Sequence, residues 1–480
     1  MNSNADASTA PFVRPLPGSH RNASIVRVAV VGAGPAGLYA VESLLEAAPD
    51  FCIDVFDRLP TPYGLVRYGV APDNQKMKSV TRVLRNSFNN EARVRFIGNV
   101  CFGVDVRRAD LLKFYDAVIY ATGAPAERRI GISGEDLPGS YGAKEFVEWY
   151  NGHPDIAHHN FLLDSQHVAV IGAGNVALDV ARMLIRSPEE VASTDVPDRV
   201  LAAFRNSQIT DVHLIARRGP AQAKFTPVEL RGIGSLLNAD IVVRPEEMVL
   251  SDSDDIRIGA NRELRTNIAM LREWAGVPLQ GKARRLHIRF LRSPVRILGE
   301  KRVEGIVLEG NEQLADEHLC GTGNFETLKV NMIFRAVGYR PLRLPDVPFD
   351  EAKSIIPNNR GRVLNENGQL TEKEYVTGWA KRGPSGTIGT NRSDSAETVC
   401  TLLADIPARK VCNSSDPEQI LIFLDSRRVN YTNWMNWLRL DDYETQLGRK
   451  QGRPRVKIPD LRSMLELSRN SDTSDFAGDD

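Results

Sequence analysis

Three glycines near the start of the chain have the spacing of a turn that holds a phosphate group. Gly32, Gly34 and Gly37 form the pattern Gly-x-Gly-x-x-Gly. The first glycine permits a tight turn, the second lets the backbone approach a pyrophosphate, and the third lets a helix and a strand pack closely. The apolar run 28–31 precedes the turn and a helical pattern follows from Leu38, so the order is strand, turn and helix. The free N–H groups at the start of that helix would bind the phosphates of a dinucleotide.

An acidic residue after the next expected strand indicates which kind of ribose the bound dinucleotide would have. The apolar run 51–56 ends at Asp57, which lies 20 positions after Gly37, where a carboxylate holds ribose hydroxyls. Strand 115–120 is followed by Gly123, and a glycine at a strand end allows a ligand to approach the backbone. These features predict a dinucleotide site with an unphosphorylated ribose, the alternative being a purely structural turn.

The same order of strand, turn and helix returns about 140 residues later. The run 167–171 leads into Gly172 and Gly174, and Ala177 stands at the third position, where alanine is an accepted variant. A second, independent fingerprint predicts a second nucleotide site in a second domain.

The next expected strand after the second glycine turn is followed by basic residues. Strand 211–216 is followed by Arg217 and Arg218, with no acid at that place. Arginine there accommodates the 2′-phosphate of NADP and is not expected beside a bare ribose. The alternative interpretation is a pair of solvated arginines at a strand end.

Together the two sites predict an enzyme that contains FAD and uses NADP(H). We expect the flavin and nicotinamide rings to meet between the domains, with hydride passing from NADPH to FAD. The five cysteines form no Cys-x-x-Cys pair, so the electrons have no internal disulfide through which to leave. A flavin can release electrons singly, and an external acceptor is therefore required: a one-electron protein, a quinone or a small molecule.

The composition bounds the other possibilities. The 480 residues include 61 basic and 61 acidic side chains, so no global field favours nucleic acid or a membrane surface. No apolar run approaches the roughly 20 residues that span a bilayer. Scattered cysteines, odd in number, indicate a reducing compartment and no metal site. We expect a cytoplasmic protein, with the mitochondrial matrix as the alternative if residues 1–24 are a transit peptide.

These motifs belong to an α/β fold with two Rossmann-like dinucleotide-binding domains, each with three layers around a central parallel sheet. The FAD domain is expected to be discontinuous. The expected division is a flexible tail at 1–24, the first part of the FAD-binding domain at 25–125, the NADP-binding domain at 126–344, the second part of the FAD-binding domain with C-terminal helices at 345–467, and a disordered tail at 468–480.

Several longer motifs match a known family. They are Tyr-Gly-Leu-Val-Arg-Tyr-Gly-Val-Ala-Pro-Asp at 63–73, Gly-Asn-Val-Ala-Leu-Asp-Val-Ala-Arg at 174–182, Arg-Arg-Gly-Pro at 217–220 with Glu-Leu-Arg at 229–231, and Gly-Trp-Ala-Lys-Arg-Gly-Pro-Ser-Gly at 378–386. From about residue 26 to residue 467, the sequence resembles the adrenodoxin reductase type of ferredoxin–NADP⁺ reductase.

The resemblance implies roles for individual residues. The implied FAD contacts are Ala36, Asp57, Leu65, Gly386, Thr387 and Ile388, with Trp379 near the isoalloxazine ring. The implied NADP contacts are Asn175, Val176, Arg217, Arg218 and Glu229, with Gly386 near the nicotinamide. Asp179 would lie near the flavin and join a proton or polar relay. The resemblance also implies a monomer, and an acidic [2Fe–2S] ferredoxin-type partner docked by Arg231, Arg262 and Arg265.

One residue departs from the family pattern, in which His often follows Ala-Pro-Asp. This chain has Asn74 there, and an amide cannot titrate near neutral pH as an imidazole does. Other functions also remain open: an NADPH flavin subunit like that of glutamate synthase, an NADPH-dependent flavoprotein with a non-ferredoxin acceptor, and a flavin-binding protein without turnover. The absence of cysteine from residues 1–24 counts against the glutamate synthase type.

Overall fold

The computed structural model describes residues 25–47, 51–90, 92–314, 318–406 and 416–469, which fold into two compact units. The first unit contains the described residues up to 64 together with 81–125 and 341–437. The second contains 65–80, 126–340 and the described residues from 438 onward. The tails that the sequence predicts at 1–24 and from 470 lie outside the described residues.

The first unit is built on a seven-stranded sheet in the order β16-β17-β18-β4-β1-β2-β3. Its strands are β1 (Val26–Val31), β2 (Phe51–Phe56), β3 (Val94–Ile97), β4 (Ala117–Tyr120), β16 (Asn358–Asn359), β17 (Arg362–Leu364) and β18 (Leu370–Val376). The strands from β18 to β3 are parallel, and β16 and β17 pair antiparallel at one edge. β1 is buried along its whole length, as expected for a central strand of a parallel sheet.

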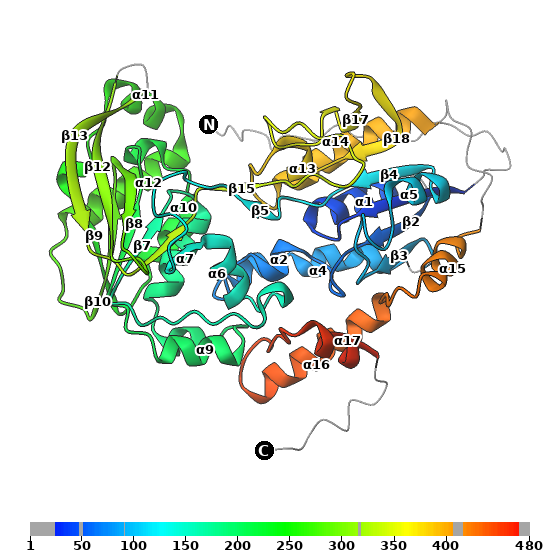
Figure 1. The fold of residues 1–480 in the computed structure, drawn as a ribbon, viewed down its shortest axis with the longest axis horizontal. Coiled ribbons are helices and arrows are strands. Elements are labelled where there is room, and N and C mark those ends of the chain that lie inside the picture. The colour runs from blue at the N-terminus through cyan, green and yellow to red at the C-terminus, as the bar shows by residue number, and fades with distance from the viewer. Residues whose placement is uncertain (1–24, 48–50, 91, 315–317, 407–415, 470–480) are drawn as a thin grey trace, which may run out of the picture. The chain divides into compact units, whose positions relative to one another are not determined.

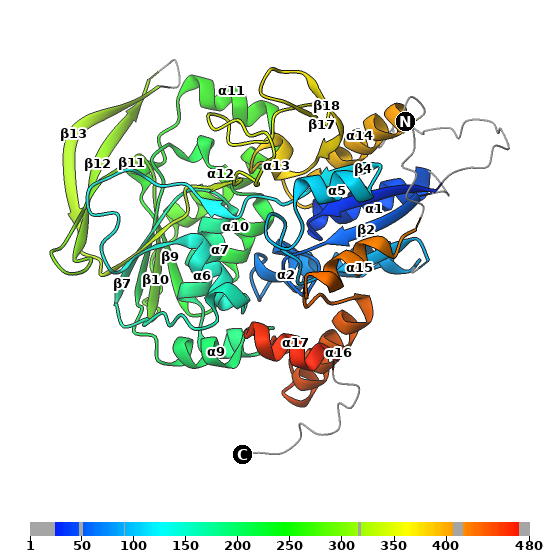
Figure 2. The same ribbon diagram turned by 45° about the vertical axis from the view of Figure 1, so that its right-hand side comes forward.

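Helices cover both faces of this sheet. The helices of the unit are α1 (Pro35–Ala47), α4 (Thr81–Leu84), η1 (Arg85–Phe88), α5 (Arg108–Phe114), α13 (Trp379–Arg382), α14 (Thr390–Asp405) and α15 (Gln419–Ser426). α1 and α14 pack side by side, as Figures 1 and 2 show. The opposite face packs against α5 and α15 through a core that includes Val31, Leu111 and Leu424.

The second unit contains a six-stranded, fully parallel sheet in the order β6-β14-β7-β8-β10-β9. Its strands are β6 (Ser140–Gly142), β7 (His167–Ile171), β8 (Asp211–Ile215), β9 (Ala239–Val243), β10 (Arg284–Arg289) and β14 (Met332–Arg335). One face packs on helices through Val170, Leu214 and Leu230. The helices of the unit are α2 (Leu65–Tyr68), α3 (Gln75–Lys78), α6 (Ala143–Tyr150), η2 (Pro154–Ile156), α7 (Asn175–Ile185), α8 (Pro188–Ala192), α9 (Asp198–Arg205), η3 (Pro220–Gln222), α10 (Pro227–Gly234), η4 (Pro245–Glu247), α11 (Asp252–Ala260), α12 (Arg262–Gly276) and α17 (Leu461–Arg469).

The other face of the parallel sheet is covered by a second sheet in place of helices. This antiparallel sheet contains β11 (Arg292–Leu298), β12 (Gly305–Gln313) and β13 (Leu319–Leu328), and Figure 1 shows β13 at its outer edge. Ile306 and Leu308 of β12 pack with Ile171 and Ile215 of the parallel sheet. A short antiparallel ribbon, β5 (Ala126–Glu127) with β15 (Tyr339–Arg340), completes the strands of the unit.

Two segments expected in the FAD-binding domain belong to the second unit. These are 65–80 and the residues from 438 onward, which include most of α16 (Trp434–Lys450). An ion pair joins the two segments, with Arg67 Nη2 2.6 Å from Glu444 Oε1. A second ion pair joins the later segment to the rest of the unit, with Lys457 Nζ 3.1 Å from Asp195 Oδ2. Within the described residues, no helix has the length and apolar character needed to cross a membrane.

Candidate functional site

The first glycine turn has a shape that only glycine permits at two of its positions. Gly32 has a φ of 114°, and a Cβ there would lie 2.5 Å from the carbonyl oxygen of Ala121. A Cβ at Gly37 would lie 2.0 Å from the Gly32 carbonyl oxygen. At Gly34 the nearest atom to an added Cβ is 4.0 Å away, so the turn is open at the position where a pyrophosphate would approach.

Asp57, at the end of β2, is bonded to the same turn. Its Oδ2 accepts a hydrogen bond from the Ala33 N–H at 2.9 Å, and its Oδ1 accepts one from the Leu59 N–H at 3.0 Å. Burial raises the pKa of this carboxyl, and the two backbone donors act in the opposite direction. Each carboxylate oxygen has a second lone pair, so the group can still accept from ribose hydroxyls.

A distant part of the chain is tied to the start of α1. Gly378 has a φ of 73°, and a Cβ there would lie 2.5 Å from the Ala36 Cβ. The Ser395 hydroxyl donates to the Ala36 carbonyl oxygen at 2.8 Å. Asp394 accepts from the Gly378 N–H at 2.6 Å and from Arg382 Nη1 at 2.9 Å. The motif at 378–386 therefore lies against the first glycine turn within the first unit.

The remaining expected contacts of this site differ in exposure. Gly386, with a φ of 79°, and Thr387 are exposed, and the Thr387 N–H donates to Thr390 Oγ1 at 3.0 Å. Ile388 and Trp379 are half-buried, and the Trp379 indole N–H donates to the Ser385 carbonyl oxygen at 3.1 Å. A Cβ at Gly123 would meet no atom of the described residues within 4 Å. Leu65 is exposed at the start of α2 and belongs to the second unit.

The second glycine turn repeats this geometry in the second unit. Gly172 has a φ of 148°, and a Cβ there would lie 2.4 Å from the Ala336 carbonyl oxygen. Among the residues that the structure describes, an added Cβ at Gly174 would meet nothing within 4 Å. Asn175 begins α7, and its Oδ1 accepts from the Thr226 N–H at 2.8 Å. Val176 and Ala177 follow in the first turn of the same helix, whose N-terminus is thus free to face an anion.

The two arginines lie beside this turn because β7 and β8 are adjacent parallel strands. The Gly172 N–H donates to the Ile215 carbonyl oxygen at 2.9 Å, and Arg217 and Arg218 follow two and three residues later. Both arginines are exposed. Within the described parts of the chain, neither guanidinium has an ion-pair partner, so both can bind a phosphate.

A buried ionic cluster surrounds Arg182 on α7. Its Nε and Nη2 donate to the Asp73 carboxylate at 2.7 and 3.0 Å, Nη2 lies 2.8 Å from Asp179 Oδ1, and Nη1 lies 3.4 Å from Glu229 Oε2. Burial raises the pKa of Asp179 to about 7 even though Arg182 opposes the shift. The Asn74 amide donates to Glu229 Oε1 at 3.2 Å, so the amide replaces the titrating ring of the family pattern with a fixed donor.

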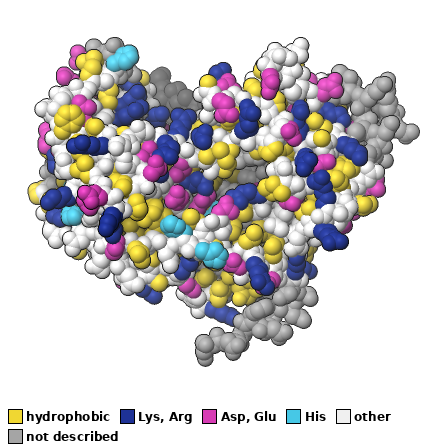
Figure 3. All heavy atoms as spheres, viewed as in Figure 1, with side chains coloured by type: hydrophobic (Ala, Val, Ile, Leu, Met, Phe, Trp, Pro, Cys, Tyr) yellow, Lys and Arg dark blue, Asp and Glu magenta, His cyan; other side chains and the backbone are white. Residues whose placement is uncertain are grey.

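The three arginines expected to dock a partner lie on two helices of the second unit that pack together. Arg231 is on α10, and Arg262 and Arg265 are on α12. All three are exposed, and Arg265 Nη2 donates to the Gly259 carbonyl oxygen at 2.6 Å. On the face that Figure 3 shows, basic and acidic side chains are interspersed, so any charged docking site must be local.

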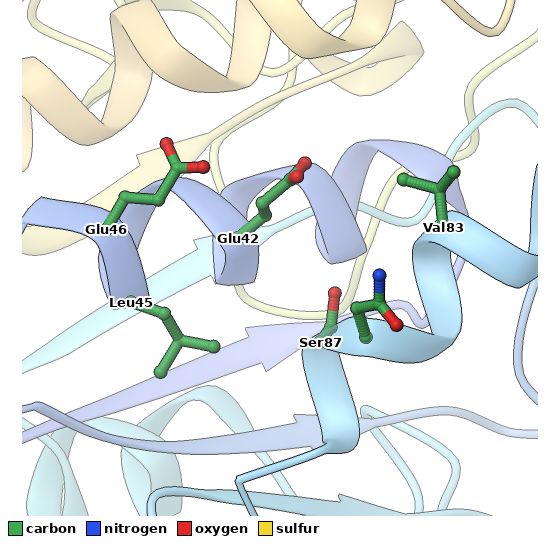
Figure 4. A pocket seen from close by; sticks show the side chains of 6 residues that line it. Glu42, Leu45, Glu46, Val83 and Ser87 are labelled. Atoms are coloured by element: carbon green, nitrogen blue, oxygen red, sulfur yellow. The ribbon is translucent and has the colours of Figure 1, made fainter.

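A shallow pocket of about 190 Å³ lies apart from these turns (Figure 4). Glu42 and Glu46 of α1 line it together with Val83 and Ser87. These glutamates lie in the C-terminal half of α1, whereas the glycine turn precedes the N-terminus of the helix. The pocket therefore belongs to neither nucleotide site.

Sequence reasoning missed several residues that shape the sites. Asp73 and Arg182 lie within the motifs at 63–73 and 174–182, but their direct pairing left no local signal. Asp394, which holds Gly378 and Arg382, follows the last motif by several residues. Asn311, which contacts the Arg217 backbone, is in no motif.

The fold and its two glycine turns define a class: oxidoreductases that hold two nucleotides on paired parallel sheets. Residues 26–218 match the family model described as pyridine nucleotide-disulphide oxidoreductase. NADPH-ferredoxin reductase FprA of Mycobacterium tuberculosis is 41% identical over 456 residues, covering 92% of this chain and 98% of the relative. The mitochondrial NADPH:adrenodoxin oxidoreductase of Arabidopsis thaliana is 36% identical over 467 residues, covering 93% of this chain and 96% of the relative.

A solved structure of M. tuberculosis FprA in complex with NADPH matches with a TM-score of 0.87 and 40% identity, covering 93% of this chain and all of that one. This chain therefore belongs to the adrenodoxin reductase type of ferredoxin–NADP⁺ reductase family. The enzyme class and the fold class predicted from the sequence are confirmed.

Proposed function

We propose that this chain is an FAD-containing NADPH:ferredoxin oxidoreductase. The observation that carries the proposal is the contrast between two glycine turns: one is bonded to the carboxylate of Asp57, and the other lies beside the exposed guanidinium groups of Arg217 and Arg218. Bound FAD supplies the exchange between a two-electron donor, NADPH, and a one-electron acceptor. The residues present fit both nucleotides, because the turns are open at Gly34 and Gly174, where the phosphates would lie.

The residues of the first turn bind and orient FAD. The helix N-terminus and Gly32, Gly34, Ala36 and Gly37 hold the pyrophosphate, and Asp57 accepts from the ribose hydroxyls. Gly123 leaves room beside the backbone, and the Gly386-Thr387-Ile388 turn, Leu65 and Trp379 complete the contacts that we assign to FAD. The Asp394 hydrogen bonds support the motif at 378–386 in a fixed position.

The residues of the second turn bind and select NADPH. The backbone from Gly174 to Ala177 holds the pyrophosphate, and Arg217 and Arg218 bind the 2′-phosphate. Glu229 and Asp179 belong to the buried cluster around Arg182, which fixes their carboxylates close together. We assign Asp179 the role of holding a proton near neutral pH, because its pKa is raised to about 7.

The acceptor that we propose is an acidic [2Fe–2S] ferredoxin, docked by Arg231, Arg262 and Arg265. Support comes from the exposure of these arginines on two helices that pack together. Two similar proteins, an NADPH-ferredoxin reductase and an NADPH:adrenodoxin oxidoreductase, also support it. We further propose a monomer, located in the cytoplasm, with the mitochondrial matrix as the alternative.

The test is reduction of purified [2Fe–2S] ferredoxins by the FAD-loaded protein with NADPH as donor. We expect an acidic ferredoxin to be reduced at a rate that falls as salt is raised, because docking between opposite charges is screened. A rate independent of salt would contradict the docking assignment. Reduction of a quinone or a small dye, but of no ferredoxin, would favour the non-ferredoxin acceptor.

A further inference from the structure

The backbone that carries the two arginines is held by the antiparallel sheet. The Asn311 side chain of β12 donates from Nδ2 to the Arg217 carbonyl oxygen at 2.8 Å, and the same Nδ2 lies 2.8 Å from Ser293 Oγ of β11. Asn311 is only 8% exposed. A buried amide that bonds a loop carbonyl fixes that loop against the sheet.

This contact is one of three hydrogen bonds that, with the peptide bond between the two arginines, form a closed ring, which we call the circuit. The Asn311 N–H donates to the Leu291 carbonyl oxygen at 2.9 Å, and the Leu291 N–H donates to the Arg218 carbonyl oxygen at 3.2 Å. The Asn311 side chain then returns to Arg217. The end of β8, the turn between β10 and β11, and β12 are thus linked through two consecutive arginines.

Leu291 makes its two bonds in a strained conformation. Its φ is 55°, in the left-handed region that a branched side chain rarely adopts. Strain of this kind persists where the surrounding structure imposes it, and it gathers at functional positions. Here the strained residue uses both its N–H and its carbonyl to link Arg218 to Asn311.

From this circuit we infer that Asn311 is a positioning residue that sets the preference of the second site for a 2′-phosphorylated nucleotide. The inference rests on the proposed role of Arg217 and Arg218. Arginine side chains are long and lose rotamer freedom on binding, so their affinity for a phosphate depends on where their Cα atoms are held. The antiparallel sheet then has two roles, because it covers the parallel sheet and also supplies the side chain that holds the arginine pair.

The experiment measures binding by calorimetry with adenosine 2′,5′-bisphosphate and with 5′-AMP, which lacks the 2′-phosphate. In Asn311→Leu we expect the affinity for the bisphosphate to fall roughly threefold to tenfold, the factor that one net hydrogen bond represents. The affinity for 5′-AMP should change little. In turnover, KM for NADPH should rise by a similar factor and kcat should change less than KM. The matched control is Asn324→Leu on the exposed strand β13, which should alter neither ligand.

The outcomes separate this inference from the proposed function. If Asn311→Leu weakens both ligands equally or neither, the inference is wrong, since a purely structural role would not discriminate between them. If the unmodified protein itself shows no preference for the bisphosphate, the assignment of Arg217 and Arg218 fails. Should Asn311→Leu not fold, Ser293→Ala removes only the second partner of the amide. It should cause a smaller loss in the same direction, and an unchanged ratio of affinities would overturn the inference.

Discussion

Arg182 and Asp73 form a buried bidentate pair in which Nε donates to Oδ2 at 2.7 Å and Nη2 donates to Oδ1 at 3.0 Å. Asp73 ends the motif at 63–73, and Arg182 ends the motif at 174–182. The pair therefore fixes one motif to the other within the second unit, 109 residues apart in the chain. It also leaves Arg182 as the shared partner of Asp179 and Glu229.

Replacing this arginine should destabilise the second unit strongly. In Arg182→Met three carboxylates lose their common partner, and breaking a buried ion pair in this way costs about 3–5 kcal/mol. Asp73 keeps its contact with Arg186 Nε at 2.9 Å, so we expect a loss toward the lower end of that range. The midpoint of urea unfolding should fall accordingly. Arg462→Met is the control, because Arg462 is exposed and pairs with Glu466 one helical turn away, so its loss should cost less than about 1 kcal/mol. Equal shifts in the two variants would show that the cluster contributes little.

Removing one of the exposed arginines should weaken the preference for NADPH. In Arg217→Ala one charge-assisted contact to the 2′-phosphate is lost, which corresponds to about 1.5–3 kcal/mol and to roughly a tenfold to hundredfold weaker affinity. Binding of NADH should be nearly unchanged, since it carries no phosphate there. Unchanged NADPH affinity, measured by titration at constant salt, would remove the basis of the NADP assignment.

The stability of the protein should depend on His213 in acid. Burial lowers the pKa of His213 to about 3, and His287, stacked on it at 4.3 Å, adds to the effect; Arg289 and His167 also lower the pKa, and Asp211 raises it. Because the folded state disfavours the charged ring, the stabilisation is fully present above the unfolded pKa of about 6.5. It is lost progressively as the pH falls from there toward 3. In His213→Phe, which cannot be protonated, unfolding midpoints should fall less steeply over this range; an identical slope would contradict the burial of a neutral His213.

Asp179 should act in the opposite sense. Its pKa of about 7 in the folded protein lies above the usual value. Its contribution to the free energy of unfolding is therefore fully present below about pH 4 and is lost as the pH rises through 7. Asp179→Asn removes this ionisation. The stability of the unmodified protein relative to the variant should therefore decline between those limits and level off above them. A constant difference across the same series of unfolding curves would show that Asp179 does not titrate there.

Charge reversal at the proposed docking site should slow ferredoxin reduction selectively. In Arg231→Glu and Arg262→Glu, we expect the KM for ferredoxin to rise roughly tenfold at low salt, because charges at an interface mainly set the association rate. Reduction of ferricyanide, which needs no docking, should keep its rate. Equal losses with both acceptors would place these arginines outside the docking surface.

The parts of the molecule that follow from local pattern could be predicted from the sequence. The glycine spacing predicted both turns. The residue types after β2 and β8, Asp57 and Arg217, predicted a different nucleotide for each turn. The structure shows that a Cβ at Gly32 or Gly172 would collide with the backbone of a neighbouring segment, so the pattern has a direct steric cause.

What could not be predicted depends on pairings between distant residues. Glu444, placed by the sequence with the FAD-binding domain, is buried against Arg67 from 377 residues away, and both lie in the second unit. The antiparallel strand β13 was not predicted, because Gly321, Gly323 and its largely exposed residues break the apolar alternation. In the sequence, nothing distinguishes Asn311 from any other polar residue of a strand. Only the fold brings its side-chain amide to the Arg217 carbonyl oxygen.

The most direct test of the two-nucleotide account is an anaerobic titration of the purified, FAD-loaded protein, followed by visible absorbance. We expect about one FAD per chain, loss of the flavin absorbance on addition of NADPH, and a much weaker response to NADH at the same concentration. A protein that takes up no flavin, or whose flavin absorbance NADPH leaves unchanged, would contradict the account.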